Sequence, residues 1–293
     1  MDLYFHNKMF LFKKKNMFLM YIMKLHFTTF TNSNYMNSNR IAKQAYELNI
    51  FDKIFQFTEE HIPDFINKHI DFINNHTHGY GYYIWKPKII LDSLDKINDN
   101  DILVYCDAGM YLNKNGMERL NHYLNKLNNE DIDIVTFSSN GPKAKCFIKM
   151  DAIMEYYPEF NENNSDMNDT YAGVIIIKKT NKSINLIKDW LNLCENYNFL
   201  DTNHSTKFNE ASYFCGHNKD MALFNLCLAK HKISYDIHPD EINIYTPDGR
   251  QFHHTNPNLK QIDVNNADWS SLDNKPFQAR RITPKFNYAE NIY

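Results

Sequence analysis

The sequence contains little glycine and lacks the glycine-rich motifs that bind phosphate groups. Only 8 of its 293 residues are glycine, and neither GxGxxG nor GxxxxGK occurs. Both motifs depend on glycine because the backbone must come close to the phosphates. Their absence disfavours the dinucleotide-binding and P-loop classes of nucleotide-binding protein.

Cysteine is also scarce, and its arrangement argues against a disulfide framework. The 5 cysteines are odd in number, lie far apart and include no CxxC pair. Several fall in apolar runs, which is typical of reduced core thiols in a reducing compartment. Cys215 and His217 resemble half a zinc site, but no second pair with suitable spacing follows them, so we expect no zinc there.

Long hydrophobic runs are absent as well. No apolar run reaches the roughly 18 residues that a membrane-spanning helix requires. The segment MFLMYIM at 17–23 follows three lysines and imitates a short signal peptide, but no small-residue cleavage site follows it. We therefore expect residues 1–22 to be an N-terminal extension, residues 23–293 to form one domain, and the protein to be cytoplasmic.

The overall composition is that of an ordinary globular protein, with 43% hydrophobic and 23% charged residues. The formal net charge is −3. Proteins that bind nucleic acid usually carry a basic face or a high isoelectric point, so we expect no nucleic acid partner.

Strand-like and helix-like segments alternate along the chain, which predicts parallel β-α-β units. The strand patterns lie at 24–30, 50–57, 101–106, 133–138 and 170–179. Helical patterns lie at 38–48, from Thr58, from Pro87, at 117–127, at 184–194 and at 219–231. Past about residue 240 the chain contains spaced prolines, which predict an irregular tail around the domain. The sequence thus predicts an α/β fold with a Rossmann-type, mostly parallel central sheet flanked by helices.

Two segments carry the strongest chemical signal. The apolar run DILVYCDAG at 101–109 places Asp107 at the carboxyl end of a buried strand, where ligands bind in open α/β sheets. Just upstream, GYGYYIWKPKII at 79–90 combines aromatic rings with lysines, which suits a base, a sugar ring and a diphosphate. Alternatively, Asp107 is satisfied by backbone N–H groups, Trp85 packs in the core and Lys86 is solvated.

The order of these pieces over residues 23–240 resembles a family of GT-A fold glycosyltransferases, also called nucleotide-diphospho-sugar transferases, found in large DNA viruses and bacterial surface-polysaccharide loci. The matching positions are Ser38 and Arg40, residues 79–87, Tyr105, Asp107, Ala108, Gly109, Lys149, Asp151, Ala172, Gly173, His217 and Asp220. Family positions usually held by His, Gln and Ser are Lys219, Met221 and Ala222 here, and a usual Gln is missing around Thr170. These departures affect the acceptor or catalytic half more than the donor half.

The resemblance implies an enzyme that transfers a sugar from a nucleotide diphosphate donor to a glycan, protein or other hydroxyl acceptor, with Mn²⁺ or Mg²⁺ at the leaving diphosphate. The donor-binding residues it implies are Arg40, Tyr80, Tyr82, Trp85, Lys86, Ala108, Gly109 and Lys149. The acceptor-binding residues are Thr170, Gly173 and His217. We further expect Asp107 to bind metal, directly or through water, or to bind the ribose, and His253, beside His254, to be a late metal ligand.

Asp220 opens an apolar helix and is expected to act as the general base of an inverting transfer, as a carboxylate that orients the acceptor, or as a helix cap. A location in a host-cell cytoplasm or a virion would agree with a viral family. Two other functions remain open at this stage. The first is a degenerate relative that binds a nucleotide sugar or glycan without turnover. The second is a metal-dependent phosphoesterase using Asp107, His217 and Asp220, although no two-metal carboxylate cluster is visible.

Overall fold

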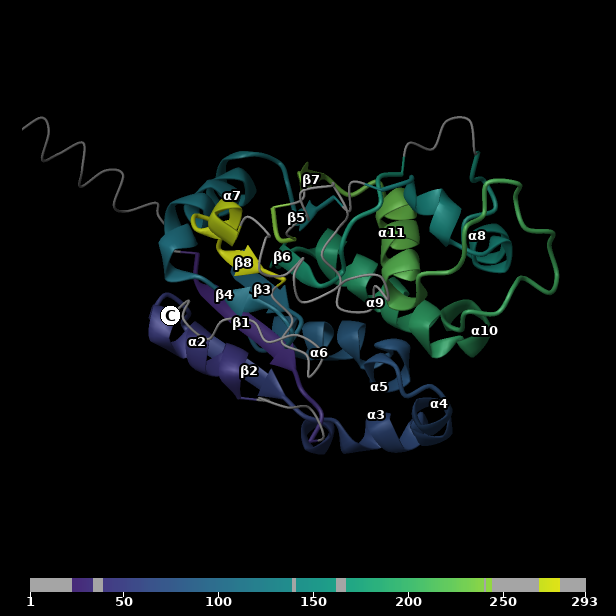
Figure 1. The fold of residues 1–293 in the computed structure, drawn as a ribbon, viewed down its shortest axis with the longest axis horizontal. Helices are drawn as coiled ribbons and strands as arrows, with labels where there is room; N and C mark the ends of the chain where they lie inside the picture. Colours follow the sequence, from purple (N-terminus) through teal and green to yellow (C-terminus); the bar gives the residue numbers. More distant parts are fainter. Residues whose placement is uncertain are drawn as a thin grey trace, which may run out of the picture.

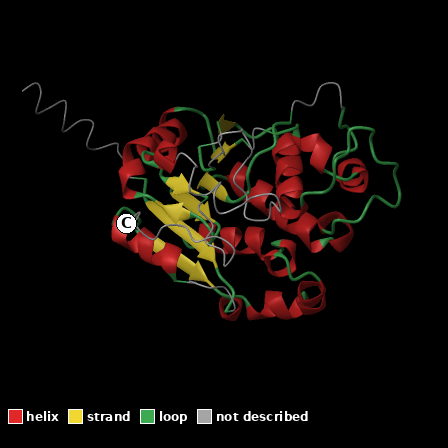
Figure 2. Cartoon of the chain, viewed as in Figure 1, coloured by secondary structure: helices red, strands yellow, loops and turns green. Residues whose placement is uncertain are grey.

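The computed structural model describes residues 23–33, 39–138, 141–161, 167–239, 241–243 and 269–279. The expected extension at 1–22, the helix-start residue Ser38, His253 and His254 lie outside these residues. The described chain forms a mixed α/β fold in which helices flank both faces of a six-stranded sheet (Figures 1 and 2). The predicted fold class is confirmed.

The central sheet is mostly parallel. Its strands lie in the order β2 (Lys53–Phe57), β1 (Leu25–Phe30), β3 (Ile102–Cys106), β6 (Val174–Lys178), β5 (Ile134–Phe137) and β7 (Tyr235–His238). Strand β1 pairs in parallel with β2 and β3, and β5 pairs in parallel with β7. Strand β6 runs antiparallel to both of its neighbours. The pattern at 170–179 therefore correctly marked a buried strand, but this strand does not continue the parallel β-α-β units.

Alternation along β3 decides which side chains share a face, because successive residues of a strand point to opposite sides. Leu103 and Tyr105 belong to the hydrophobic core under α6 (Trp85–Leu94), α9 (Asn181–Glu195) and α11 (Lys219–His231). The alternate residues Ile102, Val104 and Cys106 belong to the core under α2 (Arg40–Leu48) and α7 (Met117–Asn129). The end of β3 therefore approaches the α6 and α11 side.

Several helix predictions are confirmed in place. Helix α11 begins and ends at the predicted residues, and Pro87 lies in the first turn of α6, where its missing N–H costs nothing. The helical stretch expected from Thr58 is divided into short pieces instead. The remaining elements are η1 (Glu59–His61), α3 (Pro63–Lys68), α4 (Ile70–Asn75), α5 (Gly79–Tyr82), η2 (Lys114–Gly116), η3 (Ala144–Phe147), α8 (Met150–Tyr156), α10 (Tyr197–Leu200) and η4 (Trp269–Leu272).

The described part of the C-terminal tail packs against the domain. Strand β8 (Phe277–Gln278) pairs antiparallel with β4 (Tyr111–Leu112), which follows the end of β3. The side-chain amide of Asn113 donates to the carbonyl oxygens of Asp273 at 2.8 Å and Lys275 at 3.1 Å. The tail is therefore tied to the segment that leaves Asp107.

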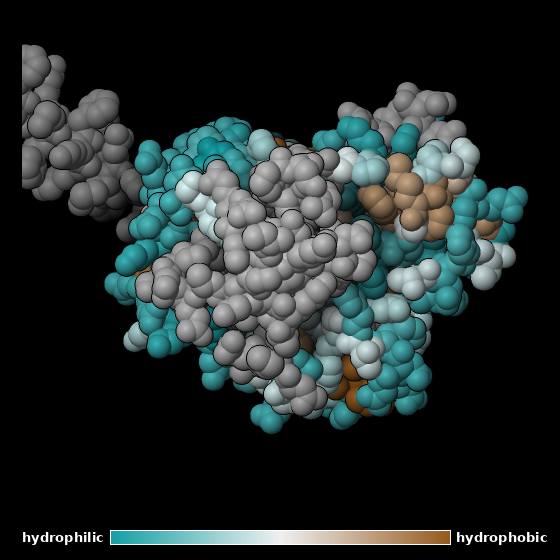
Figure 3. Space-filling model, viewed as in Figure 1, coloured by the Kyte–Doolittle hydropathy of each residue, from teal (hydrophilic) through white to brown (hydrophobic). Residues whose placement is uncertain are grey.

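Among the described helices, none has both the length and the apolar character needed to span a bilayer. Among the atoms that carry a hydropathy colour in Figure 3, most are hydrophilic, with separate hydrophobic areas.

Candidate active site

Asp107 directly follows β3 and keeps 21% of its side chain exposed. Its Oδ1 atom accepts a 2.5 Å hydrogen bond from the Tyr105 hydroxyl, which lies on the same side of the strand. A Cβ atom at Gly173 would lie 3.0 Å from Oδ2 of Asp107. Glycine at position 173 therefore lets the backbone lie close to Oδ2, where any larger residue would crowd the carboxylate.

A buried ammonium group lies next to this carboxylate. Helix α6 places the Lys86 Nζ atom 3.3 Å from Oδ1 of Asp107 and 2.8 Å from Oδ2 of Asp220. Burial alone would lower the pKa of Lys86, but the charges of Asp107 and Asp220 outweigh it and raise that pKa above its ordinary value. Lys86 therefore remains charged and joins two acids that are distant in the sequence.

Asp220 is the buried acid of this triad. Burial raises the pKa of Asp220 to about 6, even though the neighbouring Lys86 charge acts to lower it. Burial, followed by the charge of Asp107, also raises the pKa of Tyr105 well above its usual value, so its hydroxyl remains a donor. The Asp107–Lys86–Asp220 triad thus changes from net charge −1 to neutral when Asp220 takes up a proton near pH 6.

A strained turn positions the start of α6. Residues 79–83 all have positive φ angles, from 53° at Tyr82 to 83° at Gly81. This left-handed conformation costs an L-residue about 1–2 kcal/mol, while glycine adopts it freely. A Cβ atom at Gly79 would lie 2.5 Å from the Tyr83 ring. The turn brings that ring over Lys86, whose Nζ lies 4.6 Å from the ring centroid.

The other aromatic residues of this segment divide into two groups. Trp85 is buried, stacks on Phe30 with 4.0 Å between ring centroids, and donates from Nε1 to the Gly79 carbonyl oxygen at 3.0 Å. Trp85 therefore packs in the core, which is the alternative to a donor-binding role for this residue. Tyr80 and Tyr82 are only partly buried, and the Lys219 ammonium lies 5.3 Å from the Tyr82 ring centroid. These two tyrosines retain surface that a ligand can reach.

Arg40 is brought to the Asp107 turn from α2. Its Nη2 atom donates to the Ala108 carbonyl oxygen at 2.7 Å, and its guanidinium carbon lies 3.7 Å from the Tyr111 ring centroid. The backbone N–H of Met110 closes the turn by donating to the Asp107 carbonyl oxygen at 2.9 Å. Arg40 therefore fixes the Ala108–Gly109 segment beside Asp107.

Three other predicted site residues make their contacts elsewhere. The Lys149 ammonium bonds to the Asn198 carbonyl oxygen at 2.7 Å and to Asp201 Oδ1 at 2.5 Å. His217 Nδ1 accepts from the Lys149 backbone N–H at 3.2 Å, and burial, then the Lys149 charge, lowers the pKa of His217 to about 3. Thr170 is buried and bonded to Asn225 through its backbone and hydroxyl groups. Their predicted donor and acceptor roles remain predictions.

Tyr105 and Tyr83 both contact the triad, although the sequence predicts no role for either side chain. Tyr105 could have been recognised, because residues two apart on a strand share a face and Tyr105 precedes Asp107 by two. The sequence offers no comparable signal for Tyr83, whose position depends on the left-handed turn.

The described residues do not fit the divalent metal that the family resemblance implies. In the regions the structure describes, no group of three or more His, Cys, Asp or Glu side chains is placed to hold a metal. Oδ1 of Asp107 already contacts Tyr105 and Lys86, and Asp220 is buried against the same ammonium. The predicted ligand His253 lies outside the described residues. The phosphoesterase interpretation gains no support from this arrangement.

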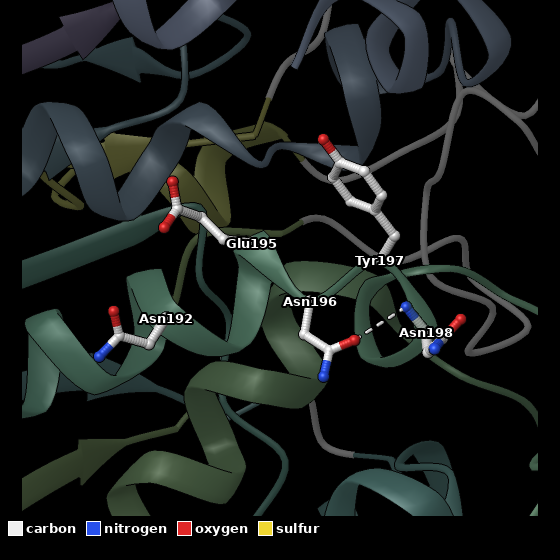
Figure 4. Close-up of a pocket in the computed structure, with 5 residues that line it drawn as sticks. All are labelled: Asn192, Glu195, Asn196, Tyr197 and Asn198. Atoms are coloured by element: carbon white, nitrogen blue, oxygen red, sulfur yellow. Dashed lines mark hydrogen bonds between the residues drawn. The ribbon is translucent and has the colours of Figure 1, made fainter. Parts of the chain in front are cut away.

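A separate hollow of about 490 Å³ lies where α9 meets α10. Figure 4 shows the side chains that line it, which are Asn192, Glu195, Asn196, Tyr197 and Asn198. Glu195 is already paired with Lys68 at 2.7 Å. None of the lining residues belongs to the Asp107 triad, so this hollow is not the site expected at the end of β3.

Comparison with known proteins gives structural likenesses without close sequence similarity. No protein-family model matches the chain, and neither does any curated protein. The structure is similar to a glycosyltransferase involved in the glycosylation of the major capsid of PBCV-1, with TM-score 0.43 and 11% identity over 88% of this chain and 96% of the other.

Two further solved structures are similar at a lower level. Mouse xyloside xylosyltransferase 1 has TM-score 0.40 and 10% identity, over 75% of this chain and 87% of that one. The 4-diphosphocytidyl-2C-methyl-D-erythritol synthase from Anaerococcus prevotii has TM-score 0.34 and 10% identity, over 74% of this chain and 89% of that one. At these levels the likenesses establish neither a family nor an activity for this chain.

Proposed function

We propose that this chain is a glycosyltransferase that moves a sugar from a nucleoside diphosphate donor to a hydroxyl group of a glycan or protein. The observation that carries the proposal is Asp107, a partly exposed carboxylate at the carboxyl end of β3 with a buried ammonium behind it. Open α/β sheets bind ligands at this edge. The resemblance of residues 79–87 and 105–109 to the GT-A family supports a nucleotide sugar as the ligand.

Asp107 is the carboxylate that we assign to substrate contact. Its side chain is 21% exposed, so it can accept a hydrogen bond from a hydroxyl group of the donor ribose or sugar. Arg40 supports the adjoining turn, and the partly exposed Tyr80 and Tyr82 rings offer apolar surfaces for a base or sugar.

Asp220 is too buried to contact substrate in this conformation, and we assign it to positioning Lys86. A direct role as general base would require substrate binding to separate α6 from α11. The pKa of Asp220 near 6 would suit that role, because a base works best with a pKa close to the working pH.

The proposal is tested with a panel of UDP-, GDP- and TDP-linked sugars. We expect at least one donor to raise the melting temperature of the wild type, and we expect release of nucleoside diphosphate when a hydroxyl acceptor is added. Asp107→Asn should lower release by about 100-fold or more, whereas Asp92→Asn, further along α6 and paired with Lys88, should not. A panel in which no donor stabilises the protein and none is consumed would refute the proposal.

A second function is binding of a nucleotide sugar or glycan without turnover. It is favoured by the same burial of Asp220 and by the substitutions at Lys219, Met221 and Ala222. In this case a donor would raise the melting temperature, yet no nucleoside diphosphate would be released with any acceptor. The two assays therefore separate the two functions.

A further inference from the structure

The Lys86 ammonium lies between the carboxylates of Asp107 and Asp220, which are distant in the sequence. Two neighbouring carboxylates are a common setting for a bound cation. The Lys86 Nζ lies within 3.3 Å of Asp107 and 2.8 Å of Asp220, and its side chain is 3% exposed. The Tyr83 and Tyr105 rings lie 4.6 Å and 5.6 Å from the same nitrogen, which adds favourable contacts with their negative faces. Two carboxylates and two aromatic rings therefore lie within 5.6 Å of the ammonium nitrogen.

A divalent ion at Asp107 would compete with this arrangement. Mg²⁺ and Mn²⁺ prefer several unhindered oxygen ligands, and Mg²⁺ in particular requires nearly ideal octahedral geometry. Oδ1 of Asp107 is occupied by the Tyr105 hydroxyl and faces the ammonium, so only Oδ2 remains. An ion bound there would also be repelled by a neighbouring positive charge that cannot move into solvent.

We infer that Lys86 is the built-in cation of this site and that Asp107 binds no divalent metal ion. This inference deepens the proposed function, because it means that Asp107 contacts the donor directly and not through a metal-bound diphosphate. Lys86 is a positioning residue in this scheme. It holds Asp107 in place and offsets the negative charge that the two acids would otherwise present to an incoming diphosphate.

The first test measures Mn²⁺ binding without any nucleotide, through the loss of the free-ion electron paramagnetic resonance signal. We expect no saturable binding to the wild type at millimolar Mn²⁺. Lys86→Met removes the charge at similar length and leaves two acids side by side, so Mn²⁺ should bind at least about 10-fold more tightly. Adding Asp107→Asn to that variant should remove the new site.

Lys88→Met is the matched control, because Lys88 lies on the same helix and pairs with Asp92 at 2.5 Å, outside the triad. It should leave Mn²⁺ binding as weak as in the wild type. Saturable Mn²⁺ binding to the wild type that disappears in Asp107→Asn would overturn the inference. This outcome uses only the wild type and a near-isosteric variant, so it decides the matter even if Lys86→Met does not fold.

The second test compares donor-induced shifts in melting temperature in EDTA and in Mn²⁺. We expect equal shifts in both, and a shift that requires Mn²⁺ and depends on Asp107 would overturn the inference. If no donor binds under either condition, the proposed function fails, while the Mn²⁺ titrations without nucleotide still decide the role of Lys86.

Discussion

Two buried lysines at helix starts, Lys86 and Lys149, show how similar local settings lead to different chemistry. Lys86 is 2% exposed and Lys149 is 1% exposed. Lys86 contacts two carboxylates, one of which reaches the surface at the end of β3. Lys149 contacts one carboxylate, Asp201, and the Asn198 carbonyl oxygen.

The two lysines differ in the net charge of the group that each forms with its carboxylate partners. The Lys149 pair is balanced, and Asp201 also accepts from the Asn203 backbone N–H at 3.1 Å, so the group connects α8 to the loop after α10. The Lys86 triad keeps an excess negative charge and an accessible oxygen on Asp107. A buried lysine by itself is therefore weak evidence for function, while an unbalanced charged group that reaches the surface is stronger evidence.

The largest expected effect is on the transfer rate, and it should distinguish Asp107 from Asp201, the two partly exposed carboxylates that pair with these lysines. Asp107→Asn should lower the transfer rate by about 100-fold or more, because loss of one positioned polar contact to substrate has effects of that size. Its melting temperature should stay close to the wild type, because the Tyr105 hydroxyl can still donate to an amide oxygen. Asp201→Asn should leave the transfer rate close to that of the wild type and mainly lower the melting temperature. Equal rate losses in both variants would contradict the distinction.

The two lysines should be similar in stability and different in function. Lys86→Met and Lys149→Met each leave buried or half-buried acid groups without their partner, and each should lower the free energy of unfolding by about 3–5 kcal/mol. Urea unfolding measures this. Only Lys86→Met should also change donor affinity and the pH dependence of transfer. A Lys149→Met variant with the same functional changes would show that the second lysine belongs to the site.

A smaller effect is expected at the left-handed turn that places Tyr83 on Lys86. Gly79→Ala introduces a Cβ atom 2.5 Å from the Tyr83 ring at a φ of 60°, and should cost about 1–3 kcal/mol. Tyr83→Ala removes the ring, so Gly79→Ala should cost less in that background. Urea unfolding of the four variants of this double-mutant cycle checks the coupling. If the losses in the free energy of unfolding from Gly79→Ala and Tyr83→Ala simply add, the contact with the Tyr83 ring is not the cause of the loss in Gly79→Ala.

The smallest expected effect is a shift in pH dependence. The pKa of Asp220 is raised to about 6 from an ordinary value of 3.8. The native state therefore binds more protons than the unfolded state between these values, and this group's contribution to stability falls as pH rises from about 4 to 6. If the ionised triad is the active form, transfer should rise with pH around 6.

The midpoint of that pH profile should depend on the charged groups next to Asp220, because they set its pKa. Lys86→Met removes a positive charge and should move the midpoint to higher pH, because Lys86 favours the ionised acid. Lys149→Met should leave it unchanged. Measurement of the transfer rate divided by donor KM from pH 5 to 8 checks both, and an unchanged midpoint in Lys86→Met would remove Asp220 from the titration.

The features that the sequence predicted well are those with short-range causes. Asp107 follows an apolar five-residue strand, Ile102–Cys106, and α11 spans the predicted residues because its apolar positions repeat at helical spacing. Pro87 marks the first turn of α6 because proline lacks the N–H that later turns require. The direction of β6 was not predictable, because parallel and antiparallel buried strands have the same apolar pattern.

The sequence by itself determined the alternation of strands and helices and the placement of one acid at the end of a buried strand. These follow from periodicity and from the limited conformations of individual residues. Only the tertiary structure decided that Lys86 lies between Asp107 and Asp220, that Trp85 enters the core, and that Lys149 bonds to Asp201. Each of these depends on which distant segments pack together, and a charged side chain is buried only where that packing supplies its partner.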